Sequence, residues 1–296
     1  LQRELRSFKK ADPAEKHQKA IPMSVISTLA KQQLSELDRA IVQLTGLGIF
    51  FAFRSCEYLD VPYAEHGQTE ILRLRNIRFF KDGELVQHSH PELEYSDCVS
   101  LTFECQKRKE KNDTVTQEAS GDSVLCPVRF AAGLARRIRS YPDTNSNTKI
   151  STYISNGTVG NVKSVQVINV LRDVVGAIGE TRLGIAKEEV GIHSIRSGAA
   201  MAMYLSECPV YTVMLIGRWS SNAFLRYIRK QVMEFSHNIS KKMLKFQNYR
   251  HIPNFDHQIH TNDPRVRNDP NNAETRRNVS GDTSRRARLP SFAQFS

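Results

Sequence analysis

Two stretches in the second half of the chain decide how this sequence is interpreted: GIHSIRSGAA at residues 191–200 and GRWSSNAFLRYIRK at residues 217–230. In the first stretch, His193 and Arg196 are three residues apart, so on a helix they lie on the same face. None of the other eight histidines in the chain is followed by an arginine at that spacing. Pairs of this kind also arise by chance, so the spacing decides nothing alone.

The second stretch contains the single tryptophan of the chain, Trp219, and a tyrosine, Tyr227, with three basic residues close by. One interpretation is a helix that buries its aromatic residues and exposes a basic face. The other makes Tyr227 a nucleophile. Positive neighbours favour the phenolate, which a tyrosine with an ordinary pKa of about 10 seldom forms at neutral pH.

A third feature lies further upstream, where Arg54 follows the apolar run 49–53 and Glu57 comes three residues later. An arginine at the end of a buried segment is costly unless it has an anionic partner, and Glu57 is one helical turn away. The pattern predicts an Arg54–Glu57 ion pair. The pair is either structural or holds the arginine toward a phosphate.

A fourth feature is the charged loop QKRKEK at residues 106–111, which lies between two expected strands. A charged hairpin tip is usually just solvated. A lysine on such a hairpin can also reach into a groove and protonate a leaving oxygen. Lys107 is the first candidate for this role, and Lys109 and Lys111 are close enough to remain alternatives.

Composition sets the outer limits on function. The chain has 296 residues, 40% of them hydrophobic, and a formal charge of +11. This apolar share can fill a core and excludes wholesale disorder, while the positive charge favours a polyanionic partner. The longest apolar-rich stretch, 41–53, is too short to cross a bilayer, so we expect no membrane partner.

The cysteines and histidines give no metal site. Five cysteines without a CxxC pair indicate reduced thiols and an intracellular location. His88, His90 and Cys98 are close together in sequence, but no second pair of ligands completes a zinc site. We expect neither a metal nor a cofactor.

Hydrophobic periodicity predicts an α+β fold, mostly helical with a small antiparallel β-sheet. The expected strands form two pairs, 77–80 with 85–86 around a tight Asp-Gly turn, and 99–103 with 114–116, and residues 125–128 close the β region. Helices are expected from residue 24 to 44, over 128–138 and 162–178, and from His193 onward. Gly46 and Gly48 are expected to separate the first helix from a second, buried helix at 49–53.

Three regions differ in composition. Residues 1–22 are polar and basic and contain two prolines, which indicates a linker or arm. Residues 23–250 carry the periodic pattern of a folded domain. Residues 251–296 contain seven arginines, no lysine and little apolar periodicity, so we expect a disordered basic tail.

The order of the four features along the chain carries more information than any one of them. Arg-x-x-Glu, a hairpin lysine, His-x-x-Arg, an aromatic residue after glycine and a downstream tyrosine follow one another. Together they resemble the catalytic domain of the tyrosine recombinases, the phage-integrase family of DNA strand-exchange enzymes. The resemblance covers about residues 24–246, and the sequence around Trp219 is most similar to recombinases of eukaryotic mobile elements.

The resemblance implies a set of catalytic residues. They are Arg54, Glu57, Lys107, His193, Arg196, Trp219 and Tyr227. Glu57 would support the first arginine, and Trp219 stands where many members of the family carry histidine. Trp219 and Tyr227 are eight residues apart, where the family more often has nine.

The resemblance also implies a mechanism that uses neither metal nor cofactor. Tyr227 would form a 3′-phosphotyrosyl link, and Lys107 would protonate the displaced 5′-hydroxyl. Double-stranded DNA, assembly into a synaptic homotetramer and a nuclear location follow, with residues 1–22 as the linker from a missing N-terminal core-binding domain. The apolar stripe at 232–246 would pack on its own domain or on a neighbouring subunit. Two alternatives stay open: a catalytically inactive or domesticated DNA-binding module, and a type IB topoisomerase-like enzyme.

Overall fold

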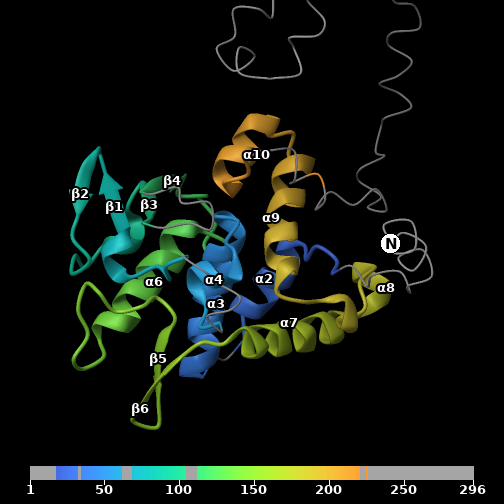
Figure 1. The fold of residues 1–296 in the computed structure, drawn as a ribbon, viewed down its shortest axis with the longest axis horizontal. Coiled ribbons are helices and arrows are strands. Elements are labelled where there is room, and N and C mark those ends of the chain that lie inside the picture. Colours follow the sequence, from blue (N-terminus) through green and yellow to red (C-terminus); the bar gives the residue numbers. More distant parts are fainter. Residues whose placement is uncertain (1–17, 33–34, 62–68, 105–111, 221–224, 226–296) are drawn as a thin grey trace, which may run out of the picture. The chain divides into compact units, whose positions relative to one another are not determined.

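Helix α3 (Glu36–Phe50) lies at the centre of the described helices, and five other elements pack against it (Figure 1). The structure is a computed structural model that describes residues 18–32, 35–61, 69–104, 112–220 and 225. The elements in contact with α3 come from the whole length of the described chain. They are α2 (Met23–Ala30), α6 (Pro127–Arg139), strand β5 (Thr152–Ser155), α7 (Ser164–Ile178) and α9 (His193–Leu205).

Helix α3 begins at a capping box. The Ser35 hydroxyl accepts a hydrogen bond from the Asp38 amide at 3.1 Å, and the Asp38 carboxylate accepts one from the Ser35 amide at 3.3 Å. This pair satisfies two amides that the helix itself leaves without partners. Every residue from Ala40 to Ile49 is buried, so the helix is covered on all sides.

The prediction that Gly46 and Gly48 separate two helices is wrong, because α3 runs through both of them to Phe50. A Cβ on Gly46 would lie 2.5 Å from the Phe130 ring of α6, and one on Gly48 would lie 3.1 Å from Ile195 of α9. The two glycines therefore allow close helix packing rather than chain reversal. The predicted helix at 49–53 is divided, since α3 ends at Phe50 and the next residues leave the helix.

The main sheet has the strand order β2-β1-β3-β4, with every pair antiparallel. Its strands are β1 (Ile77–Lys81), β2 (Glu84–Val86), β3 (Cys98–Phe103) and β4 (Asp113–Glu118). Both predicted strand pairs are confirmed. Asp82 and Gly83 have positive φ values of 52° and 81°, as the tight turn between β1 and β2 requires.

The remaining elements show two errors and one omission in the sequence prediction. The single helix expected over 24–44 is two helices, since α2 ends at Ala30 and α3 begins at Glu36. Pro127 does not extend the β region but is the first residue of α6, where its missing amide costs the helix nothing. A second hairpin, β5 with β6 (Thr158–Asn161), was not predicted. Its turn is Asn156-Gly157, and both residues have positive φ. The predicted helices near 128–138, 162–178 and from His193 onward are confirmed as α6, α7 and α9.

The other short elements connect these units. They are α4 (Ser55–Tyr58), α8 (Glu180–Leu183), α10 (Val210–Gly217) and three 3₁₀ turns at Leu74–Asn76, Leu93–Tyr95 and Lys187–Glu189. In Figure 1 the four-stranded sheet lies on one side of α3 and α4, and α9 with α10 lies on the other. None of the described helices is long and apolar enough to cross a membrane. The observed α+β class agrees with the prediction.

The segment before α2 packs against α9. Lys19 donates its amide hydrogen to the Glu189 carbonyl at 2.9 Å, and Ile21 donates to Ser194 at 3.2 Å. Ile21 is 1% exposed, and its carbonyl would lie 2.3 Å from a Cβ on Gly198 of α9. Residues 18–22 thus help to form the core, while residues 1–17 and 251–296 lie outside the described residues. Their assignment to an arm and a tail stays a prediction.

Candidate active site

Two short turns far apart in sequence meet beside α4. One is 51–54, which follows α3, and the other is 217–219, which follows α10. Three arginines and one glutamate join them. Glu57 is at the centre, and Arg54, Arg196 and Arg218 surround it.

Glu57 is 1% exposed and is held from two sides. Arg54 donates to it twice, from its amide to Oε2 at 2.7 Å and from Nη1 to Oε1 at 2.8 Å. Arg218 Nη2 donates to the same Oε2 at 2.7 Å. The predicted Arg54–Glu57 ion pair is therefore present, and a second arginine shares the carboxylate.

The charges around Glu57 decide its ionisation. Burial raises the pKa of this carboxyl, but the positive charges of Arg218, Arg54 and Arg196 together lower it further, so it ends below the usual range. Glu57 is therefore a carboxylate at neutral pH. One negative and three positive side chains leave this small region with an excess of positive charge.

Arg196 reaches the same place from α9. Its Nη1 donates to the Ala52 carbonyl, and its Nη2 donates to the Gly217 carbonyl at 2.5 Å. The guanidinium carbon lies 4.3 Å from the centroid of the Trp219 ring, which is a cation–π distance. Ala52 has a positive φ of 47°, so this turn reverses sharply after α3. Arg196 thus touches both turns at once.

His193 is the first residue of α9, one helical turn before Arg196. Its amide donates to Oε1 of Gln18 at 2.8 Å. The side chain remains accessible to solvent. Partial desolvation by the surrounding protein lowers the pKa of His193, and the charge of Arg196 lowers it further. At neutral pH the imidazole is therefore mostly uncharged and able to accept a proton.

Arg218 was not selected from the sequence, although it lies inside the quoted stretch at 217–230. Its side chain is fully buried, with Nη1 donating to the carbonyls of Phe51 and Ile216, both at 3.0 Å. Its partner Glu57 is 161 residues away in the chain. No local spacing could have indicated this pair, because it forms only when the two turns meet.

The structure brings five of the seven predicted residues into one region: Arg54, Glu57, His193, Arg196 and Trp219. Lys107 and its alternatives Lys109 and Lys111 lie outside the described residues, and so does Tyr227. Their roles stay predictions. The described strands β3 and β4 pair antiparallel on either side of residues 105–111.

The described end of that hairpin is fixed by an ion pair. Glu104 follows β3, and Arg75 donates to both of its carboxylate oxygens at 2.8 and 2.7 Å. Asn76 donates to Oε1 as well, at 2.8 Å. These bonds, with the one from Arg75 first, lower the pKa of Glu104 to about 2. The end of β3 next to residues 105–111 is thereby attached to the 3₁₀ turn before β1.

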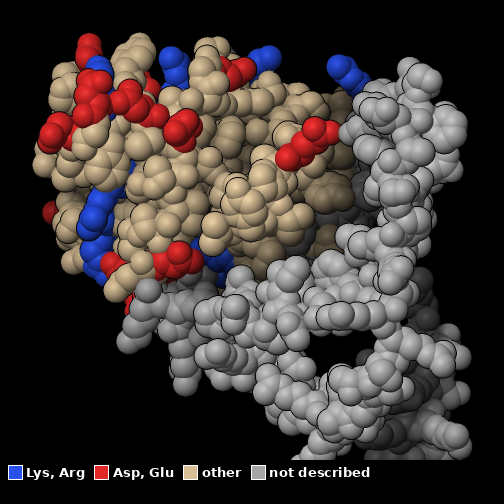
Figure 2. Space-filling view, turned by 90° about the horizontal axis from the view of Figure 1, so that it is seen from above, with Lys and Arg blue, Asp and Glu red and all other residues tan. Residues whose placement is uncertain are grey.

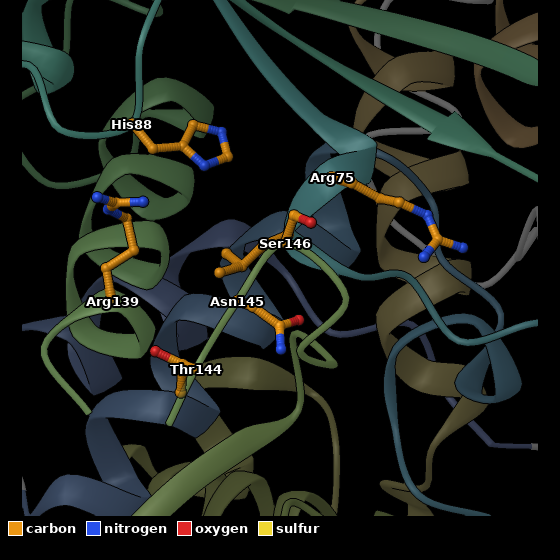
Figure 3. A pocket seen from close by; sticks show the side chains of 7 residues that line it. Arg75, His88, Arg139, Thr144, Asn145 and Ser146 are labelled. Carbon is orange, nitrogen blue, oxygen red and sulfur yellow. The ribbon is translucent and has the colours of Figure 1, made fainter. Parts of the chain in front are cut away.

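A separate polar pocket of about 180 Å³ lies near the C-terminal end of α6. It is lined by Leu74, Arg75, His88, Arg139, Thr144, Asn145 and Ser146. In Figure 3 the side chains of His88 and Arg139 lie near one another, while Arg75 points away from them. None of the predicted catalytic residues lines this pocket, so it is distinct from the arginine cluster.

The exposed charges are spread out on the face seen in Figure 2. Lys and Arg side chains in its described part are scattered among Asp, Glu and uncharged residues, without one broad basic surface. Across the described residues, no group of three His, Cys, Asp or Glu side chains is placed to hold a metal ion. Within the described residues, the buried cluster brings the charges of Arg54, Arg196 and Arg218 together around Glu57.

Comparisons with known proteins give only distant likenesses. No protein-family model matches the chain, and no curated protein matches it. Among solved structures, it is similar to XerH site-specific recombinase bound to difH substrate in a pre-cleavage complex, with a TM-score of 0.47, 14% identity and coverage of 77% of this chain and 56% of that one. A post-cleavage complex of XerH with a palindromic difH substrate gives the same score and identity, with coverages of 75% and 52%. The chain thus spans little more than half the length of these structures.

Proposed function

We propose that this protein is a DNA strand-exchange enzyme of the tyrosine-recombinase type. The observation that carries the proposal is the meeting of Arg54 and Arg196 around Glu57 and the turn 217–219. The sequence resemblance assigns these two arginines to one phosphate without any knowledge of their positions. Packing that brings them to the same region supports that assignment.

The chemistry of the cluster suits a phosphodiester. Attack on phosphorus builds negative charge on the non-bridging oxygens, and forked guanidinium donors stabilise such charge. Arg54 is the more accessible of the two, with 23% of its side chain exposed. Glu57 fixes one edge of Arg54 through Nη1, and Nη2 reaches the Arg218 carbonyl at 2.9 Å. The arginine is thereby held in one orientation before any substrate arrives.

The remaining roles follow from the side chains that the resemblance names. Tyr227 attacks the phosphorus, and the 5′-hydroxyl leaves with a proton from Lys107. His193, largely neutral, assists proton transfer. Trp219 packs its ring on Arg196 and so keeps that guanidinium in place. The phosphotyrosyl link conserves the energy of the broken bond, so rejoining needs no nucleotide.

The finer parts of the proposal concern the setting of this reaction. Double-stranded DNA is the substrate, and a homotetramer that holds two sites together is the working assembly. The amino-acid sequence around Trp219 supports a recombinase of a eukaryotic mobile element, acting in the nucleus. The positive charge of +11 supports general contact with the DNA backbone.

One observation favours a second candidate, a DNA-binding module without catalysis. Arg196 is only 3% exposed, and both of its terminal nitrogens donate to backbone carbonyls. Arginines with a purely structural role are bound in this way. The binding module requires no covalent intermediate, and this difference separates the two candidates.

Covalent capture on nicked DNA tests the proposal. The protein is incubated with a pool of nicked duplexes of randomised sequence, in which cleavage releases a short strand and traps the adduct. We expect an adduct with the unaltered chain, none with Tyr227→Phe, and an unchanged yield with Tyr211→Phe, a residue of α10 that is 67% exposed.

Other outcomes favour the alternatives. An adduct that persists in Tyr227→Phe overturns the nucleophile assignment. Salt-dependent DNA binding with no adduct on any duplex favours the binding module. Relaxation of supercoiled DNA by a monomer, without preference for a site, favours a topoisomerase.

A further inference from the structure

Arg218 is the most completely enclosed charge in the cluster. Its side chain has no exposed area, and its guanidinium carbon lies 3.7 Å from the centroid of the Phe103 ring. Nη1 donates to the carbonyls of Phe51 and Ile216, and Nη2 donates to Glu57. No part of this side chain is open to a substrate, so it acts only through its neighbours.

The backbone of Arg218 is held as firmly as its side chain. The residue follows α10 with φ 52° and ψ 48°, a left-handed conformation in which glycine is the usual residue. Its carbonyl accepts a hydrogen bond from Arg54 Nη2 at 2.9 Å, and the preceding carbonyl, of Gly217, accepts one from Arg196 Nη2. One turn therefore supplies an acceptor to each of the two proposed phosphate-binding arginines.

The same turn places the Trp219 ring. A Cβ on Gly217 would lie 1.7 Å from that ring, so the ring folds back over a position that only glycine leaves empty. From there it covers the guanidinium of Arg196. The conformation at 217–218 thus sets the positions of Arg54, Arg196 and Trp219 together.

We propose that Arg218 is a positioning residue for the strand-exchange reaction, which, through its bond to Glu57 and the turn that it forms, fixes Arg54 and Arg196 toward a shared phosphate. The proposal rests on the proposed function. It differs from a purely structural role because it makes the ionisation of Glu57, and through it the orientation of Arg54, depend on the charge of Arg218.

Several charged and titratable groups surround Glu57 and Arg218. Arg54 and Arg196 face Glu57, Asp113 at the start of β4 faces Arg218, and His193 faces Arg196. Cys56 and Tyr58 flank Glu57 on α4, and burial followed by the charge of Glu57 raises the pKa of both. Both flanking groups are therefore neutral in the range in which Glu57 titrates.

Removal of the Arg218 charge has a defined consequence. Burial continues to raise the pKa of Glu57, while the largest of the opposing positive charges is lost. The carboxyl then takes up its proton at a higher pH than in the unaltered chain. A protonated Glu57 no longer holds Arg54 as a charged partner, so cleavage fails at a pH at which the unaltered protein still acts.

Arg137 provides a matched control. Over the whole residue, backbone included, it is 6% exposed, close to Arg218 at 5%, and it belongs to α6. Its partners are neutral: Nε donates to Gln43 at 2.7 Å, and Nη1 donates to the Thr152 carbonyl at 2.6 Å and the Tyr141 hydroxyl at 3.2 Å. Arg137→Met removes an equally buried guanidinium without removing the partner of a carboxylate.

The test compares the full chain with Arg218→Met and Arg137→Met in single-turnover adduct formation on nicked DNA, measured across pH beside DNA affinity. We expect Arg218→Met to slow the reaction about 100-fold at unchanged DNA affinity, as misplaced catalytic groups do. As the pH is lowered, its rate should also begin to fall at a higher pH than the rate of the unaltered chain does. Adding Glu57→Gln removes the titrating group, so this additional dependence of the rate on pH should disappear. Arg137→Met should leave the pH profile in place.

The proposal is overturned if Arg218→Met keeps the rate and pH profile of the unaltered protein, or differs from it no more than Arg137→Met does. If Arg218→Met does not fold, Arg218→Lys replaces it. Lysine keeps the charge but not the fork, so the pH profile should stay while the rate falls, and an unchanged rate overturns the proposal.

Failure of the proposed function gives a different result. If the unaltered chain forms no adduct, strand exchange is wrong whatever Arg218 does. The carboxyl carbon signal of Glu57 in ¹³C-labelled full-length protein then shows whether Arg218→Met raises the pH at which this carboxyl titrates, while Arg218→Lys, which keeps the charge, should leave the titration in place. An unchanged titration in Arg218→Met overturns the role of Arg218 separately.

Discussion

At the scale of single residues, Glu57 is the side chain on which the cluster depends. It is buried, carries a charge, and accepts hydrogen bonds from two arginines that come from different parts of the chain. A buried ion pair contributes little net stability compared with apolar packing, but loss of one partner is expensive because a charge remains without compensation. The cluster is thus sensitive to any change at position 57.

Glu57→Gln should lower the free energy of unfolding by about 3–5 kcal/mol, because Arg218 is then left as a buried cation without its anion. Urea denaturation followed by circular dichroism measures the change. Glu118→Gln on the exposed side of β4 is the control and should alter stability by less than about 0.5 kcal/mol. Equal effects of the two substitutions would contradict the central place of Glu57.

The pH dependence of stability follows from the same carboxylate. The pKa of Glu57 is lower in the folded chain than in the unfolded chain, where a glutamate titrates near about 4.3. Its contribution is therefore complete above that pH and is lost as pH falls through the folded value. Glu104 behaves in the same way, down to a pKa of about 2.

We expect the unfolding free energy of the native sequence to fall as pH is lowered from about 4.3 toward 2. Glu104→Gln should make that decline less steep, and so should Glu57→Gln. Thermal unfolding at a series of pH values measures the slopes. A slope that is unchanged in both variants would show that neither carboxylate has a lowered pKa in the folded chain.

At the scale of elements, the close packing of α9 at a glycine fixes the helix that carries part of the site. Gly198 lies in α9, two residues after Arg196, and faces the Ile21 carbonyl from the segment before α2. A carbonyl of the backbone cannot move aside as the end of a flexible side chain can. Close approach at this point fixes α9, and with it His193 and Arg196.

Gly198→Ala should destabilise the protein by at least about 1 kcal/mol, because a methyl group 2.3 Å from a backbone carbonyl forces α9 or residue 21 to shift. Gly176→Ala in α7 is the matched control. Its Cβ would meet only Lys187 at 3.7 Å, so the helix propensity of alanine should stabilise it by up to about 1 kcal/mol. Thermal unfolding measures both, and destabilisation by Gly176→Ala alone would contradict this account of α9.

The elements also show how far periodicity predicts structure. The β1–β2 and β3–β4 pairs and helices α6, α7 and α9 were expected, because each has a clear local pattern. The error at Gly46 and Gly48 arose because glycine has two uses, to turn a chain and to admit a neighbouring helix. Only the position of Phe130 and Ile195 distinguishes them. The β5–β6 hairpin also has a local signal, its Asn156-Gly157 turn, in which both residues have positive φ.

In the site, too, contacts between residues close in sequence could be predicted, and contacts between distant segments could not. The Arg54–Glu57 pair could be predicted because both partners lie on one helical turn. The contacts of Arg196 with Trp219 and of Arg218 with Glu57 could not, because they join segments that meet only after folding. The resemblance in residue order gives the seven predicted catalytic residues. Arg218 can be identified only from its contacts in the folded chain.

At the scale of the whole molecule, the site depends on both ends of the described chain. Arg54 and Glu57 follow the end of α3, in the first part of the described chain. Arg196 and Trp219 belong to the last described helices and the turn after them. The site therefore exists only when α3, α9 and α10 pack together. In the proposed function, this junction binds one DNA phosphate during cleavage.

Arg196→Lys tests that claim most directly, with the rate of covalent adduct formation on nicked DNA measured beside DNA affinity. Lysine keeps the positive charge but loses the guanidinium fork and its packing on Trp219. We predict a rate at least about 100-fold lower, as for loss of a transition-state donor, with DNA affinity nearly unchanged because other phosphate contacts remain. Arg139→Lys, exposed at the end of α6, should leave both unchanged. An Arg196→Lys protein that forms the adduct at the native rate would contradict the claim.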